Sequence, residues 1–188
     1  PAGWQQAMVI DGTNQSMWHY DSPHWTSAEL LDDGVNKKTE YFNRVANRIK
    51  VEMHYGGSVR SVVWSHNLGK SLQQIFASDE FVASDIPEKD WHDLLGEGVA
   101  GVDTEWAVQG FNARYVTYSW PLGEKLGMRL GIYMSSLWYP TPNAMIGVGL
   151  QALEGWTGGD SDRADLAPAA GAHCGYTGEM AFDCTSHT

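Results

Sequence analysis

The sequence contains little cysteine and few charged residues. Its 188 residues include two cysteines, and only 19% of them are Asp, Glu, Lys or Arg. No apolar run approaches the roughly 18 to 20 residues of a membrane span, so we expect no membrane insertion. Basic residues are scarce, 12 against 23 acidic ones, and the formal charge is −11. Because phosphate binding requires clustered Lys and Arg, this charge argues against nucleic acid as a partner.

Aromatic residues and glycine, in contrast, are abundant. Aromatic residues make up 12% of the chain, including nine Trp, and they are mixed with 21 Gly. This mixture is typical of extracellular β-rich domains, in which flat rings cover sheets and glycines form turns. A chain of this length buries roughly 70% of its unfolded surface. We therefore expect residues 1–188 to form one domain, and the negative charge favours cations or neutral glycans as its ligands.

The local patterns predict an α+β fold. In the segment 48–64, apolar and polar residues alternate over 49–55, and Gly56-Gly57 then precede a second, valine-rich run, which predicts a β-hairpin with a two-residue turn. Helical spacing predicts helices around residues 68–76 and 87–95, the second with Asp85 as its N-cap. Strands are predicted over residues 6–10, 16–20, 104–109, 114–119, 129–134 and 144–150, a short helix over 26–32, and a long ordered loop from 154 onward. Strands and helices thus follow in blocks instead of alternating.

The two cysteines, Cys174 and Cys184, indicate an oxidising compartment. They lie ten positions apart in a Gly-rich tail, a spacing that can close a small disulfide ring. Two free thiols are the alternative, and a zinc site of both cysteines with His173 and His187 is a weaker one, because adjacent ligands suit a tetrahedral site poorly. The sequon at Asn14 predicts glycosylation. Together these features predict a secreted, extracellular protein.

An acidic cluster in the tail predicts a calcium site. Asp160 and Asp162 follow two glycines, and Asp165 lies three residues further on. Short oxygen-rich loops bind Ca²⁺ because the ion accepts six to eight carboxylate and carbonyl oxygens. The late bidentate Glu of an EF-hand is missing, so the site would be a loop site, and a solvated acidic loop is the alternative.

Residues around this cluster are candidate ligand contacts. Trp156 and Tyr176 flank it in the sequence and could stack on the face of a sugar. His173 and Glu179 lie on either side of Cys174 and could supply polar contacts. Core packing is the alternative for each of the four.

Catalytic motifs are absent. The sequence has no HExxH zinc motif and no GxSxG nucleophile elbow. Carboxylate pairs such as Asp103 with Glu105, or Asp93 with Glu97, could serve as the acid and base of a glycosidase, but nothing in the sequence fixes their separation. We therefore do not expect an enzyme, and a glycan-acting hydrolase ranks third among the functions considered.

The order of these features resembles the fibrinogen-related domains, which include the intelectins and fibrinogen-like lectins. The opening Gly3-Trp4 and Ile10-Asp11-Gly12 are similar to the family's first strands, and residues 20–26 (YDSPHWT) are similar to the segment after them. Residues 130–132 (LGI) and 146–149 (IGVG) resemble its late core strands, and residues 160–162 (DSD) before the two cysteines resemble its calcium loop and C-terminal disulfide.

This resemblance implies a fibrinogen-like domain with mixed sheets, short helices and a long ordered C-terminal loop. In it, Asp160 and Asp162 would bind Ca²⁺ with carbonyl groups around Ala164, and the ligand pocket would lie near Cys174 and Cys184. The family's early cysteine pair is missing. The family's final strand has no counterpart either, so we expect a neighbouring chain to pair with the open edge.

Two functions follow from these observations. The first is an extracellular domain that recognises carbohydrate with the help of calcium, with glycans or glycoproteins as partners. The second is a structural or adhesive subunit of an extracellular fibre or cell-surface appendage, with homo-oligomer or fibre neighbours as partners.

Overall fold

The structure is a computed structural model. It describes residues 3–11, 15–34, 36–55, 57–94, 106–116, 125–135, 144–150 and 170–174. The elements follow in the order α1 (Gln15–Trp18), the 3-10 helices η1 (Pro23–Trp25) and η2 (Asp32–Gly34), α2 (Glu40–Asn43), β1 (Arg48–Tyr55), β2 (Ser58–Ser65), α3 (Leu72–Ser78), β3 (Val82–Ala83), α4 (Glu88–Asp93), β4 (Trp106–Val116), β5 (Lys125–Ser135), β6 (Ala144–Val148) and β7 (Ala170–Cys174). The predicted α+β class is confirmed.

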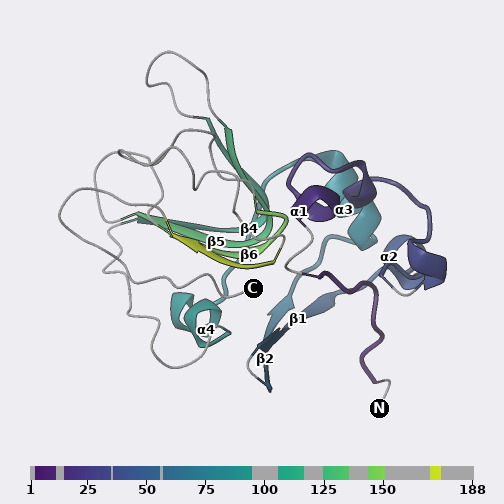
Figure 1. Ribbon diagram of the computed structural model, residues 1–188, viewed down its shortest axis with the longest axis horizontal. Coiled ribbons are helices and arrows are strands. Elements are labelled where there is room, and N and C mark those ends of the chain that lie inside the picture. The colour runs from purple at the N-terminus through teal and green to yellow at the C-terminus, as the bar shows by residue number, and fades with distance from the viewer. Residues whose placement is uncertain are drawn as a thin grey trace.

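The larger sheet has five antiparallel strands in the order β3-β4-β5-β6-β7. Figure 1 shows β4, β5 and β6 as a curved layer, with α1 and α3 beside one end of it. Neighbouring strands in this sheet are therefore neighbours in the sequence, which is a simple meander.

The smaller sheet is the predicted β-hairpin. β1 and β2 pair in register from Arg48 with Ser65 to Tyr55 with Ser58, which is the pairing that a two-residue turn requires. Val62 and Trp64 on β2 are buried and alternate with exposed residues. Burial thus alternates along this part of β2, although the apolar Val59 and Val63 lie on the exposed face.

A row of glycines crosses the larger sheet. The register pairs Gly110 with Gly131, Gly131 with Gly147, and Gly147 with Gly171. The first three have φ angles of +138°, +156° and +156°, in the region that side chains rarely adopt. A Cβ atom on Gly147 would lie 2.2 Å from the carbonyl oxygen of Leu130. Glycine is therefore required where the strands approach one another in this row.

The two predicted helices in the middle of the chain are present. α3 begins with a capping box in which Ser71 and Gln74 exchange hydrogen bonds between side chain and backbone, and it ends at Asp79 with a φ of +52°. The predicted N-cap of α4 is wrong. Its cap position is Pro87, with no side-chain cap, instead of Asp85. Because the residue before a proline is disfavoured in the α region, Ile86 cannot continue a helix that starts at Asp85.

Three predictions near the N-terminus are corrected. The strand expected over residues 6–10 is not formed, and only Met8 makes an isolated bridge, with Lys37. Residues 16–20 were expected as a strand, but α1 occupies Gln15–Trp18. The indole of Trp25 donates to the carbonyl of His19 at 2.9 Å and packs edge-on against Trp18, so tertiary contacts stabilise the turn. The helix expected over 26–32 is absent, and these described residues instead connect η1 to η2.

Two further corrections concern the larger sheet. The two strands expected over 104–109 and 114–119 are one strand, β4, in which Asn112 has a φ of +51°. The long loop expected from 154 onward contains β7, which pairs with β6. β7 has alanine or glycine at three of its five positions, so its sequence produces no apolar periodicity.

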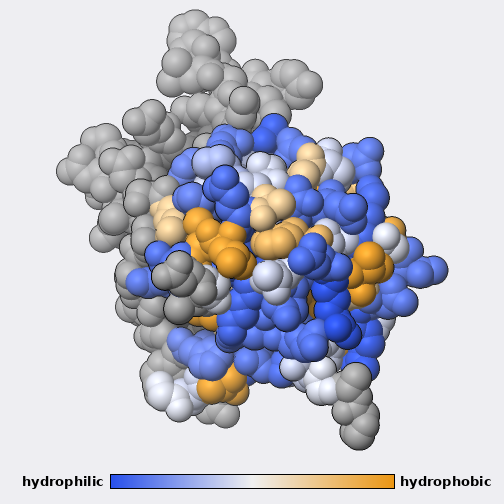
Figure 2. Space-filling model, turned by 90° about the vertical axis from the view of Figure 1, so that its right-hand side faces the viewer, coloured by the Kyte–Doolittle hydropathy of each residue, from blue (hydrophilic) through white to orange (hydrophobic). Residues whose placement is uncertain are grey.

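The core contains many of the aromatic rings. Trp18 contacts Trp25, Trp25 contacts Phe76, and Phe76 contacts Phe111, each pair edge-on with ring centroids 4.9 to 5.5 Å apart. Trp64 packs against Phe111 at 4.7 Å. On the face that bears α2, hydrophilic residues predominate and hydrophobic ones form small patches (Figure 2). The buried tryptophans therefore hold the fold together and are not available to a ligand.

A buried arginine connects the larger sheet to the N-terminal half. The guanidinium of Arg129 on β5 donates to the carbonyls of Tyr20 at 2.8 Å and Phe76 at 3.2 Å. It also donates to the side chains of Asp79 at 3.0 Å and Asn112 at 2.9 Å. All these acceptors lie on other elements, so one side chain joins several segments of the chain.

His66 makes stability depend on pH. Its ring packs edge-on against Phe111 with centroids 6.0 Å apart, and its Nε2 is buried without a hydrogen-bond partner among the described residues. Burial lowers the pKa of His66 below its usual value of 6.5. The unfolded chain therefore takes up a proton near pH 6.5 that the folded protein does not, so the free energy of unfolding falls as pH is lowered through this value.

We expect His66→Gln to reduce this loss of stability. The test is urea denaturation of both proteins at about pH 7 and about pH 5, on either side of the usual histidine pKa. The difference between the two pH values should be smaller for the variant than for the wild type. An equal difference in both proteins would contradict the assignment to His66.

Candidate functional site

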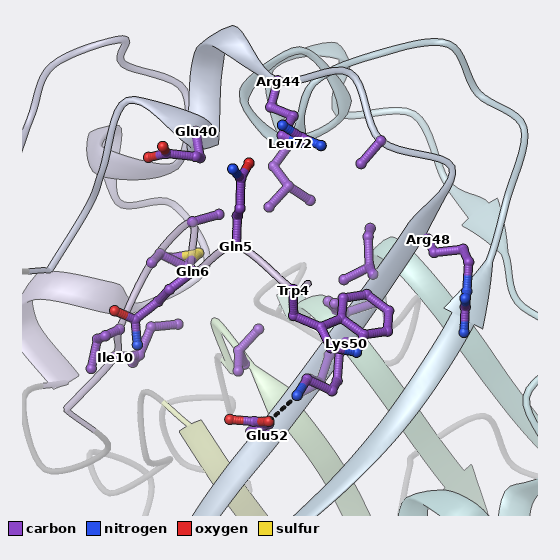
Figure 3. A pocket seen from close by; sticks show the side chains of 18 of the residues that line it. Trp4, Gln5, Gln6, Ile10, Glu40, Arg44, Arg48, Lys50, Glu52 and Leu72 are labelled. Carbon is purple, nitrogen blue, oxygen red and sulfur yellow. Dashed lines mark ion pairs between the residues drawn. The ribbon is translucent and has the colours of Figure 1, made fainter. Parts of the chain in front are cut away.

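A pocket of about 990 Å³ lies beside β1. Residues 3–10 form one wall and residues 44–54 the other. The floor is apolar and consists of core residues from α3, the end of α4, β5 and β6, namely Leu72, Phe76, Leu94, Leu130 and Val148. Figure 3 shows polar side chains around the mouth and apolar ones within. This size lies within the range of roughly 300 to 1,000 Å³ that is usual for ligand sites.

The two walls are held by different contacts. The backbone of Val9 donates to Asn36 at 2.8 Å, and Lys38 donates to Ala7 at 3.0 Å, so residues 7–9 are anchored on the side away from β1. On the other wall, the backbone of β1 pairs with that of β2. In the described part of the chain no ladder joins the two walls, and the pocket occupies the space between them.

Trp4 is the large aromatic ring at the mouth. It is 48% exposed, whereas Trp18, Trp25, Trp64 and Trp91 are each at most 5% exposed. The guanidinium of Arg48 lies 5.1 Å from its ring centroid, and the ammonium of Lys50 lies 5.4 Å from it. Both distances are within the range of a cation–π contact. The ring is therefore oriented by two cations from β1.

The charged groups of the pocket are only partly paired. Lys50 forms an ion pair with Glu52, and its hydrogen bond lowers the pKa of that carboxyl below the usual value. Arg44 and Arg48 form no ion pair with another described residue. Glu40 accepts a hydrogen bond from the hydroxyl of Thr39 at 3.2 Å. The pocket thus contains two guanidinium groups that are available to a ligand.

Gln5 and Gln6 complete the polar rim. Both are exposed, and both line the pocket (Figure 3). An amide side chain offers donors and an acceptor together. With the indole of Trp4 and the apolar floor, the site can bind a molecule that has both apolar faces and hydroxyl groups.

The structure leaves most of the predicted site residues untested. Outside the described residues lie Asn14, Trp156, Asp160, Asp162, Ala164, Tyr176, Glu179 and Cys184. His173 and Cys174 lie on β7, where their backbones pair with Met145 and Ala144 on β6. Calcium binding, glycosylation and the disulfide therefore stay predictions.

The topology nevertheless constrains how those residues meet. The segment with Asp160 and Asp162 joins β6 to β7 beside the pair Val148 and Ala170. The segment with Tyr176, Glu179 and Cys184 leaves β7 after Cys174, at the other end of the strand. The two ends are roughly 13 Å apart at the usual rise of a strand. The sheet alone does not bring the two segments together.

Within the described ranges, no three His, Cys, Asp or Glu side chains are grouped as metal ligands. No helix in the same ranges has the length and apolar character needed to cross a membrane.

Sequence reasoning missed the pocket and its arginines, although one signal was present. Arg48 and Lys50 are two residues apart in a predicted strand, so they share a face, and Arg44 precedes them closely. Three cations within seven positions are unusual in a chain with only 12 basic residues. The position of Trp4 opposite them depends on the tertiary structure.

Comparisons with family models, with curated protein sequences and with solved structures give no match.

Proposed function

We propose that this protein is a carbohydrate-recognition domain that acts outside the cell and performs no catalysis. The observation that carries the proposal is the half-exposed ring of Trp4 at the mouth of a ligand-sized pocket. Indole rings stack on the apolar faces of sugars while their edges remain hydrated. The resemblance of the sequence to fibrinogen-like lectins supports the same function.

The rest of the pocket suits a sugar as well. Gln5, Gln6 and Glu40 offer amide and carboxylate groups, which can exchange hydrogen bonds with hydroxyl groups. Guanidinium groups add further donors. A site with few polar groups around an aromatic or apolar centre is the usual form of a small-molecule pocket.

Calcium is part of the proposal through Asp160 and Asp162. Val148 lines the pocket, and the chain continues from there into the segment that contains both residues. An ion bound by that segment would support binding either by ordering it or by contacting the ligand. The cysteine pair and the sequon at Asn14 support an extracellular location.

A hydrolase is less well supported by the pocket. A glycosidase needs a carboxylic acid whose pKa is raised so that it can protonate the leaving group. Lys50 has the opposite effect on Glu52, because it lowers the pKa of that carboxyl.

We expect Trp4→Ala to weaken glycan binding by at least about tenfold, because a central aromatic contact often contributes 2 kcal/mol or more. Trp4→Phe keeps a ring and should retain part of the affinity. Binding is measured on a glycan array and then by calorimetry with the best ligand. Phe81→Ala is the matched control, since Phe81 is 49% exposed and lies outside the pocket.

The same array in calcium and in chelator separates the two predicted parts of the site. Loss of binding in chelator would support the Asp160 segment as a calcium site. Binding that Trp4→Ala does not change would contradict the pocket as the ligand site. No binding of any glycan in either buffer would contradict the function and favour the structural or adhesive subunit.

A further inference from the structure

The pocket carries positive charge on a protein that is otherwise strongly acidic. The whole chain has a formal charge of −11. The pocket lining, in contrast, includes Arg44, Arg48 and Lys50 against the two carboxylates Glu40 and Glu52. Local charge opposite to that of the rest of the surface attracts a ligand of the other sign.

The pairing within the pocket decides which cations are available. Glu52 forms an ion pair with Lys50, so these two residues together contribute no net charge. Arg44 and Arg48 remain, and no carboxylate of the described residues lies within ion-pair distance of either. Both side chains are exposed, so a ligand can reach them.

Their placement connects them to the aromatic ring. The guanidinium of Arg48 lies over the ring of Trp4, 5.1 Å from its centroid. Arg44 lines the same pocket from the end of α2, and Figure 3 shows both arginines and Trp4 around it. A sugar that contacts the ring would therefore have its substituents beside a guanidinium group.

From this juxtaposition we infer that the pocket binds an acidic carbohydrate, one with a carboxylate or sulfate group. The pyranose ring contacts Trp4, and the acidic group accepts hydrogen bonds from Arg48 and Arg44. Planar guanidinium groups match the oxygens of carboxylate and sulfate in pairs, which an ammonium cannot do. This inference rests on the proposed function and specifies its ligand class.

The test compares a short oligogalacturonide with its methyl ester, which is the same sugar chain without the charge. We expect the acid to bind at least about tenfold more tightly than the ester, since hydrogen bonds to charged groups are about twice as strong as neutral ones. Dextran sulfate and dextran form the second pair and distinguish sulfate from carboxylate. Affinities are measured by calorimetry at two salt concentrations, because the charged part should weaken with salt.

Two variants test the arginines. Arg44→Gln and Arg48→Gln should each weaken binding of the acidic oligosaccharide about tenfold and leave the ester within about twofold. Arg48→Lys keeps the charge and should lose part of the affinity, because it lacks the planar fork. Lys70→Gln combined with Lys89→Gln removes two positive charges outside the pocket and should change neither affinity.

The outcomes separate the two proposals. Equal binding of acid and ester, unchanged by the arginine variants but abolished by Trp4→Ala, would overturn the acidic ligand and leave sugar recognition intact. Binding of neither sugar pair would overturn both. Equal competition by a single-stranded oligonucleotide of the same charge would overturn the sugar specificity and show that the pocket responds to charge alone.

Discussion

Gly147→Ala is expected to destabilise the protein by at least about 4 kcal/mol, enough to unfold a domain of ordinary stability. A Cβ atom at this position would lie 2.2 Å from the carbonyl oxygen of Leu130 and 2.8 Å from the Cα of Gly131. Both are backbone atoms of the neighbouring strand, so relief requires β5 and β6 to separate. The measurement is urea denaturation followed by tryptophan fluorescence, with soluble yield as a first indication.

Gly69→Ala separates the two causes of this effect. Gly69 has a φ of +62°, but a Cβ atom there would have nothing within 4 Å. Only the backbone strain of an alanine with positive φ applies, which costs about 1 to 2 kcal/mol. A similar loss for both variants would contradict the close approach of the strands, because backbone strain alone would then account for Gly147.

The glycine row also positions the pocket. Leu130 and Val148 line the floor, and each is next to a glycine of the row, Gly131 and Gly147. Glycines let neighbouring strands approach closely and let the sheet bend there. This bend places the side chains of Leu130 and Val148 at the pocket. Substitutions in the row that still fold should therefore weaken ligand binding as well as stability.

The elements that the sequence predicts best are those with local causes. The β1–β2 hairpin follows from alternation and a glycine turn, and its register requires no information from the rest of the chain. α3 was predictable because Ser71 and Gln74 form its capping box within one turn. In both cases the interactions that define the element lie within a few residues of each other.

The elements that the sequence does not reveal depend on distant contacts. α1 is held by the packing of Trp18 and Trp25, although its apolar residues also fit a strand. The sequence of β7 has no strand pattern, and only its pairing with β6 defines it. The same reason explains the pocket, because Trp4 meets Arg48 from another part of the chain. Reasoning from local patterns favoured the acidic tail instead, which has its cluster within one short segment.

The second large effect is expected for Arg129→Met, at about 3 to 5 kcal/mol, because removal of one member of a buried polar cluster leaves the others unsatisfied. Without the guanidinium, the carbonyls of Tyr20 and Phe76 and the side-chain oxygen of Asn112 lose a buried donor. Methionine keeps an unbranched apolar stem, so the loss reports the removal of the guanidinium with its hydrogen bonds and its contact with Tyr20. Chemical denaturation at neutral pH gives the free energy of unfolding.

The ring of Tyr20 shows why Arg114 is the matched control for Arg129. Both guanidinium groups lie over this ring, with distances of 4.1 Å for Arg129 and 4.6 Å for Arg114 from its centroid. Arg114, however, contacts Asp21 and Asp79 near the surface, and pairs of this kind contribute at most about 1 kcal/mol. Arg129→Lys should also destabilise strongly, since one ammonium cannot replace the fork that reaches both backbone carbonyls. If Arg114→Met and Arg129→Met cost the same, stacking on Tyr20 would be the main contribution, and the buried hydrogen bonds would not be what joins the larger sheet to the N-terminal half.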